Sequence, residues 1–151
     1  MTKLKKALIV RAVLLIAFIA TGCTGSIMLD ITGIWEGTLT WTSGPATGLS
    51  SRLSLDLTHE GNDLTGTATL VSHASQTFDI EITQGRARNR SLTVEASGTN
   101  TLVNPPAAVE LSLTGDYNDT QMVGTGTLEV NGTSYEIDWE LTLVWAPTPE
   151  E

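Results

Sequence analysis

The chain has 151 residues, and its 17 acidic side chains outnumber its 8 lysines and arginines, which gives a formal net charge of −9 at pH 7. This length suits one domain that can bury a real core. An acidic surface repels phosphates, so nucleic acid is excluded as a favoured partner.

Residues 1–22 have the layout of a secretory signal peptide. A basic start is followed by an apolar run over residues 12–20 and then by small residues, the order that precedes a cleavage site. The apolar run is well short of the ~20 residues that cross a bilayer. Residues 19–23, Ile-Ala-Thr-Gly-Cys, resemble the lipobox of bacterial lipoproteins. An ordinary signal peptide with a chance cysteine is the alternative.

The lipoprotein resemblance implies a membrane anchor. Cys23 would carry a diacylglyceryl group and become the first residue of the mature chain, with residues 23–30 as a lipidated tether. Acyl chains hold firmly when two or more are present, at ~0.8 kcal/mol per buried methylene. Thr24, rather than Asp, follows the cysteine, which in that family favours the outer membrane, facing the periplasm or the cell surface. Residues 23–151 hold 17 acidic residues and four arginines, a charge of −13, and no second cysteine for a disulfide.

Beyond the tether, apolar residues recur at every second position, the period of a β-strand with one buried face. We expect eight strands, near residues 31–41, 52–59, 64–72, 78–83, 92–96, 109–117, 122–130 and 135–145. Short connections imply antiparallel neighbours, and closure removes exposed edges. The predicted fold is therefore all-β: an eight-stranded antiparallel up-and-down β-barrel over residues 31–146, with 147–151 as a disordered tail.

Turn residues separate these strands. Residues 60–63 (Glu-Gly-Asn-Asp), 89–90 (Asn-Arg) and 131–132 (Asn-Gly) predict tight turns, because Gly and Asn tolerate a positive φ. The fourth strand is expected to run on to Arg88 after a kink at Gly85. Residues 98–108, with two prolines, are expected to form the longest loop of the mature chain.

Three short motifs resemble the calycin group, which comprises lipocalins, fatty-acid-binding proteins and avidins. They are residues 33–35 (Gly-Ile-Trp), 64–67 (Leu-Thr-Gly-Thr) and 135–139 (Tyr-Glu-Ile-Asp-Trp). The resemblance implies a barrel in which Trp35 plugs one end. It does not imply biotin binding, because Gly37 and Trp41 stand where the avidin pattern has Asn and Ser. The cation that lipocalins place over the first tryptophan is also missing.

The barrel interior is the candidate binding site. Small inward residues face bulky ones, and the expected inward aromatic residues include Trp35, Trp41, Tyr117, Tyr135 and Trp139, with Trp145 on the same side. An eight-stranded barrel is just wide enough to be filled by side chains or to hold one small ligand. A packed core and an aromatic-lined pocket for a small apolar ligand both remain open.

Catalytic and metal chemistry finds little support in the sequence. We expect no catalytic residue, no metal site and no cofactor, because the two histidines, His59 and His73, lie apart and no nucleophile motif is present. His59 is expected at the barrel rim, and residues 116–119 read as a turn rather than a calcium loop. The arginines at 86, 88 and 90 would share a face if extended, as a solvated patch or a carboxylate site.

Two function classes follow. The first is a lipid-anchored, lipocalin-like binding module for a small apolar ligand in the cell envelope. The second is an envelope interaction or inhibitor protein that acts through its acidic outer surface with no small ligand. The eight-stranded lysozyme inhibitors illustrate the second class, but the Ser-Gly-x-x-Tyr loop of that family is absent after Ser97-Gly98. The protein is not expected to be an enzyme, and its protein partner is left open.

Overall fold

The chain folds into eight β-strands. The computed structural model describes residues 28–71 and 75–148. Its strands are β1 (Gly33–Trp41), β2 (Ser50–Glu60), β3 (Asp63–Val71), β4 (Thr77–Arg88), β5 (Ser91–Asn100), β6 (Ala107–Tyr117), β7 (Gln121–Val130) and β8 (Thr133–Trp145). Cys23, His73 and residues 149–151 lie outside the described residues.

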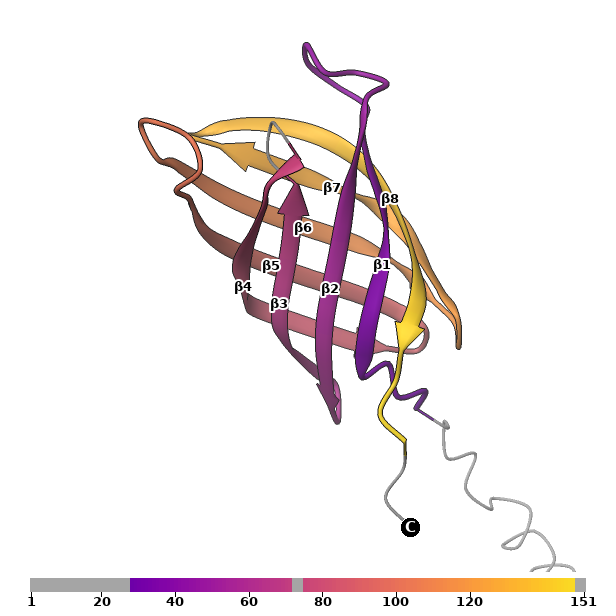
Figure 1. Cartoon of the computed structure of the whole chain (residues 1–151). Coiled ribbons are helices and arrows are strands. Elements are labelled where there is room, and N and C mark those ends of the chain that lie inside the picture. Colours follow the sequence, from indigo (N-terminus) through magenta and orange to yellow (C-terminus); the bar gives the residue numbers. More distant parts are fainter. Residues whose placement is uncertain (1–27, 72–74, 149–151) are drawn as a thin grey trace, which may run out of the picture.

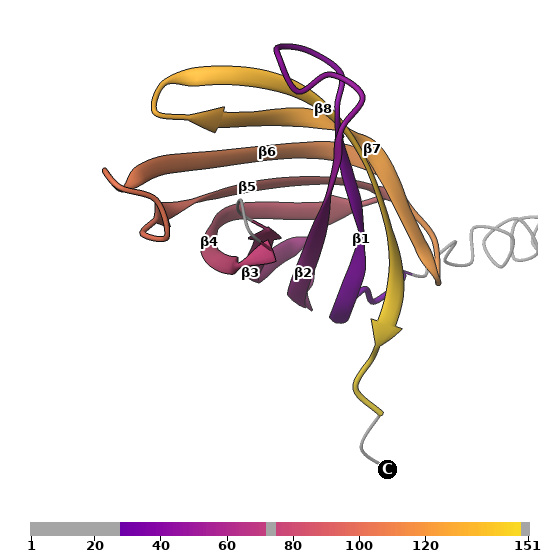
Figure 2. The same cartoon turned by 45° about the horizontal axis from the view of Figure 1, so that its top comes forward.

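Each strand pairs with the next one in the sequence, always antiparallel, and β8 pairs back onto β1 to close the barrel. Figure 1 shows the closure along the side where β1 and β8 run together, and Figure 2 shows the curvature of the sheet around the interior. The predicted eight-stranded antiparallel up-and-down barrel is confirmed. This architecture is consistent with a calycin-like fold.

The alternating pattern decides which side chains enter the barrel. In β2, Leu53, Leu55 and Leu57 are at most 1% exposed, while Arg52 and Asp56 between and beside them face solvent. Side chains of a strand point alternately to opposite faces, so a period of two in the sequence becomes one dry and one wet face. The same rule holds around the barrel and produces one continuous apolar core.

Register shifts in three strand pairings mark two bulges, one in β4, which shows against both β3 and β5, and one in β8. Each bulge changes which residues of its strand point inward. In β4 the irregularity lies between Ile82 and Gln84, so the kink expected at Gly85 falls at Thr83 instead. Ile80 and Ile82 point inward before the shift, and Gly85 and Ala87 do so after it. A bulge adds one residue to one strand and thereby flips the faces of everything that follows.

The second bulge lies in the pairing of β1 with β8. Trp35 pairs with Leu143 but Ile34 pairs with Trp145, so one extra residue of β8 stands between these pairs. Trp145 is consequently 55% exposed. The expectation that Trp145 points into the barrel is therefore wrong, because the bulge turns it to the outer face.

The turns are largely as the sequence predicts. Asn89 and Arg90 both have positive φ, 53° and 68°, and Asn131 and Gly132 form the last hairpin with φ of 50° and 81°. The loop expected over residues 98–108 is shorter than predicted, because β5 and β6 stay paired as far as Asn100 and Ala107. The connection over residues 42–49 is longer than what remains, residues 101–106.

The up-and-down order gives the barrel two different ends. The open end carries the connections at 42–49, 101–106 and 131–132. The closed end carries residues 28–32, the turns at 61–62, 89–90 and 118–120, and residues 146–148, where the described chain both begins and ends (Figure 1).

Candidate functional site

The barrel is hollow at its open end. A cavity of about 430 Å³ opens there to solvent. Its deep wall is aliphatic, with Leu39, Leu70, Val109 and Leu128 all at most 6% exposed. Nearer the mouth the wall continues through Trp41, Phe78, Val71, Val103 and Val130. A volume of this size lies within the range of about 300–1,000 Å³ typical of small-molecule sites.

The connection between β1 and β2 forms one side of the mouth. Its ends are tied together, because Trp41 N–H donates to Leu49 O at 3.0 Å and Gly48 N–H donates to Trp41 O at 2.8 Å. Within the loop, Thr47 Oγ1 donates to Gly44 O at 2.6 Å. These bonds hold Leu49 at the mouth of the cavity, although its side chain is 63% exposed.

The polar groups of the cavity wall are uncharged in the part of the chain that the structure describes. Ser50 Oγ lies 2.8 Å from Thr40 Oγ1, and Ser51 Oγ is 3.4 Å from Val71 O, to which it donates. Asn100 is 7% exposed, and its Oδ1 accepts the N–H of Leu102 at 3.0 Å. The fifteen residues of the wall include no Asp, Glu, Lys, Arg or His. A charged ligand would therefore meet no compensating charge from these fifteen residues, which disfavours its burial against them.

The five aromatic residues expected in the site do not lie together. Trp41 lines the cavity. Trp35, Tyr117 and Trp139 are buried outside its wall, and the half-buried Tyr135 lies against Gly44 of the first loop. Their predicted role as ligand contacts stays a prediction. The aliphatic wall was missed because alternation identifies inward residues but does not say at which end of a strand the interior is hollow.

The rest of the interior is packed around two tryptophans. Trp35 and Trp139 are 1% and 2% exposed, and each indole N–H is satisfied by a backbone carbonyl at 2.9 Å, that of Ile31 and that of Thr125. Buried indole groups require such a partner. The two alternatives for the interior, packed core and cavity, are thus both realised at different heights of the barrel.

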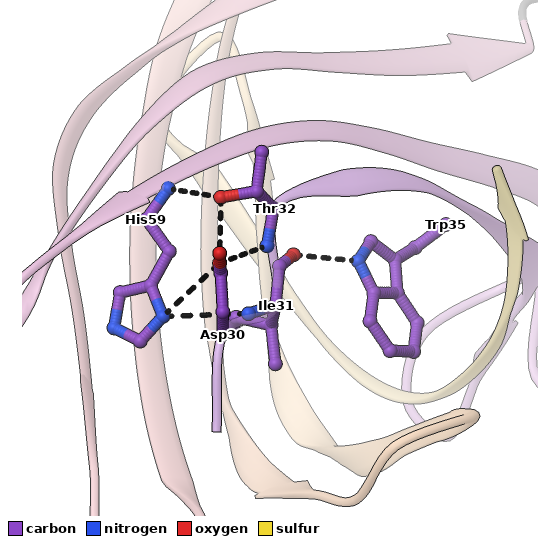
Figure 3. Close-up of polar contacts among 5 residues, drawn as sticks. All are labelled: Asp30, Ile31, Thr32, Trp35 and His59. Carbon is purple, nitrogen blue, oxygen red and sulfur yellow. Dashed lines mark hydrogen bonds and ion pairs between the residues drawn. The ribbon is translucent and has the colours of Figure 1, made fainter. Parts of the chain in front are cut away.

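A polar cluster at the closed end fixes the entering chain to the barrel (Figure 3). Thr32 Oγ1 accepts the N–H of His59 at 3.0 Å and donates to Asp30 Oδ1 at 2.7 Å, and Thr32 N–H donates to the same oxygen at 2.8 Å. Figure 3 also shows Ile31 between these residues and Trp35. The backbone carbonyl of Ile31 accepts the hydrogen bond of the Trp35 indole N–H. We call Asp30, Thr32 and His59 the latch.

The latch has a defined electrostatic character. The hydroxyl and the backbone N–H of Thr32 lower the pKa of Asp30 below its ordinary value of 3.8, against a smaller opposing effect of burial. His59 Nδ1 accepts the N–H of Ile31 at 3.4 Å and lies 3.9 Å from Asp30 Oδ1. The His59 side chain is only 3% exposed, so it sits inside the barrel end rather than on its rim.

Tyr117 lies in the same end of the barrel. Burial raises the pKa of its phenol, and a backbone hydrogen bond and the positive charge of Arg90 oppose that rise. Tyr117 N–H also donates to Arg90 O at 2.8 Å, which ties the β4–β5 turn to β6. These contacts are structural and involve no part of the cavity.

The other sites considered from the sequence were a calcium loop near residue 118 and a cluster of arginines. Asn118 Oδ1 accepts the N–H groups of Thr120 and Gln121 at 2.9 and 2.8 Å, so the turn expected at residues 116–119 is present but spans residues 118–120, after the end of β6. Arg86 and Arg88 share the outer face of β4, whereas Arg90 belongs to the turn. Across residues 28–71 and 75–148, no three His, Cys, Asp or Glu side chains gather so that they could hold a metal ion. The same part of the chain contains no helix long and apolar enough to cross a membrane.

No protein-family model matches the chain, and neither the curated proteins nor the solved structures include a significant match.

Proposed function

We propose that the protein is a lipid-anchored binding module of the bacterial cell envelope that takes a small, neutral, apolar ligand into the open end of its barrel. The cavity of about 430 Å³ supports this proposal, because apolar side chains form nearly all of its wall and it is open to solvent. Transfer of apolar surface from water contributes roughly 25 cal/mol per Å² buried, which is the driving force for such a ligand.

The chemistry of the wall favours a neutral ligand over a fatty-acid carboxylate. The polar side chains of the wall that share the inward face are the Ser51 hydroxyl and the Asn100 amide, and such groups suit a hydroxyl, ester or amide group of a ligand. Binding rather than catalysis is proposed, because the described residues of the wall include no acid or base side chain that could transfer a proton. The anchor is the acylated Cys23 that the lipobox predicts, and Thr24 favours the outer membrane.

The test compares two neighbouring alanines. Ala107 is 5% exposed and lines the cavity, whereas the next residue, Ala108, faces solvent on the same strand. Ala107→Phe fills the cavity and Ala108→Phe does not. Titration with Nile red, followed by displacement with 1-dodecanol or with dodecanoate, measures the affinity of each protein for a neutral and an anionic chain of equal length.

We expect 1-dodecanol to displace the dye more effectively than dodecanoate. Ala107→Phe should weaken dye binding at least about tenfold, equivalent to about 1.4 kcal/mol, with Ala108→Phe unchanged. Absence of dye binding, or equal binding by both variants, would overturn the proposal.

A second candidate, an interaction protein with no small ligand, draws on the outer face of β8. Glu136, Asp138 and Glu140 are all exposed there and follow one another along the strand. This row of carboxylates would attract a basic protein, and rim charges act mainly on the association rate. Binding to lysozyme that weakens with salt and is lost in Glu136→Gln/Asp138→Asn/Glu140→Gln would favour this candidate; lysozyme activity unaffected by excess protein removes its inhibitor form.

A further inference from the structure

The exposed large hydrophobic side chains of the described residues are confined to the two ends of the barrel. Leu49 and Leu102 lie on the connections of the open end and are 63% and 42% exposed. The others lie toward the closed end: Met28 at 44%, Val123 at 50%, Val144 at 58% and Trp145 at 55%. Leu49 lines the cavity and Leu102 precedes the lining residue Val103, but the second group has no part in the cavity or the core. We call Met28, Val123, Val144 and Trp145 the basal group.

Trp145 is the notable member of the basal group. The extra residue of β8 in its pairing with β1 turns Trp145 onto the outer face opposite Ile34. Val144 beside it is exposed as well, so the C-terminal end of β8 presents two apolar side chains to the outside. Exposure of the apolar tryptophan ring to water is unfavourable. At the interface of a bilayer the ring can contact lipid while its N–H remains hydrogen-bonded.

The entering chain shows what this end faces. The latch binds residues 30–32 to the end of β2, so the chain reaches the barrel at the closed end (Figures 1 and 3). Cys23 stands five positions before Met28 in the sequence, which allows at most about 17 Å when the chain is fully extended. A lipid anchor on Cys23 therefore brings the closed end to the membrane surface.

Charged groups at the closed end are mixed. Arg86, Arg88 and Arg90 are exposed there, and they are three of the four arginines after residue 22. Carboxylates lie at the same end, at Asp30, Glu60, Asp63, Asp116 and Asp119. Net charge therefore does not attract this end to anionic lipid. A contact of this end with a membrane would depend on the apolar side chains, and the arginines could pair with lipid phosphates.

We infer that the closed end of the barrel is a membrane-contact face, in which the basal group enters the headgroup region of the bilayer that holds Cys23. The inference rests on the proposed lipid anchor and goes beyond it, because it fixes the orientation of the barrel. The cavity mouth then points away from the anchoring membrane, and its ligand is exchanged with the aqueous side.

The experiment uses the full chain purified from membranes, with the mass of the acylated protein measured first. The protein is reconstituted into vesicles of phosphatidylethanolamine and phosphatidylglycerol that contain lipids brominated near the headgroup end of the acyl chains. Bromine quenches tryptophan fluorescence on contact. Trp35 and Trp139 are buried and Trp41 is at the far end, so Trp145 is the residue that such lipids should reach.

We expect Trp145→Phe to remove most of the quenchable fluorescence and Trp41→Phe to leave it unchanged. Circular dichroism checks that both variants keep the barrel. Acylated protein without quenching, or quenching lost in Trp41→Phe instead, overturns the inference and leaves the anchor intact. An unmodified Cys23 thiol overturns the anchor, and the inference with it.

Discussion

At the scale of residues, the four tryptophans have three kinds of surroundings, although the sequence pattern places all of them inside. Trp35 and Trp139 are core residues with satisfied indole N–H groups, Trp41 lines the cavity, and Trp145 is exposed. Their surroundings differ because they lie at different positions along the barrel axis and because the bulge in β8 turns Trp145 outward. The side-chain type alone therefore does not identify a binding residue here.

The latch is expected to weaken in acid, because the pKa of Asp30 is lower in the folded protein than its ordinary value. This pKa is lowered by Thr32, so the contribution of the latch to stability is present above pH 3.8 and is lost as the pH falls through the lower pKa of the folded protein. An NMR titration of the Asp30 carboxyl should give a midpoint below 3.8. In Thr32→Val, which loses the hydroxyl donor, the midpoint should rise toward 3.8; an unchanged midpoint would contradict the assigned cause.

At the scale of elements, β6 and β7 make room for a tryptophan of β8. Gly115 and Gly124 face each other across the two strands, and the Trp139 indole lies over Gly115. A Cβ atom on Gly115 would fall 2.3 Å from Val123 O and 2.7 Å from the Trp139 ring. The glycines thus allow the large ring to fill the packed part of the barrel.

Gly115→Ala should therefore lower the free energy of unfolding by about 1–3 kcal/mol, the usual cost of overpacking a core. Urea denaturation followed by circular dichroism measures this change. Gly61→Asn is the matched control, because nothing lies within 4 Å of its Cβ position and Asn tolerates its φ of 64°. Equal stability of Gly115→Ala and the natural protein would show that the strands separate more easily than this packing implies.

At the scale of the whole molecule, the two ends of the barrel carry different features. The closed end receives the chain and holds the latch and the basal group, while the open end holds the cavity. An up-and-down topology enforces this division, because every second connection falls at the same end. The candidate ligand site and the candidate membrane face are thus as far apart as the fold allows.

This orientation can be measured with spin labels in the acylated full chain. The proposed lipid on Cys23 would block that thiol, so Leu49→Cys and Val144→Cys would each provide one free thiol, at the open end and the closed end. In vesicles, we expect the label at 144 to be more accessible to oxygen, which partitions into lipid, and the label at 49 to be more accessible to a water-soluble nickel complex. The reverse result would place the cavity mouth in the bilayer.

The fold class, the eight strands and most of the inward residues could be predicted from the residue pattern, because a period of two and glycine- or asparagine-containing turns are local properties of the chain. The leucines of β2 and the turns at Asn89 and Asn131 illustrate this. Residues 19–23 also resemble a lipobox, and the predicted anchor at Cys23 rests on that resemblance. The residue pattern did not reveal the bulges at Thr83 and near Trp145, since a bulge depends on how a neighbouring strand pairs. That the open end is hollow and the other end packed became visible in the folded barrel, because it depends on which side chains from all eight strands meet at one height.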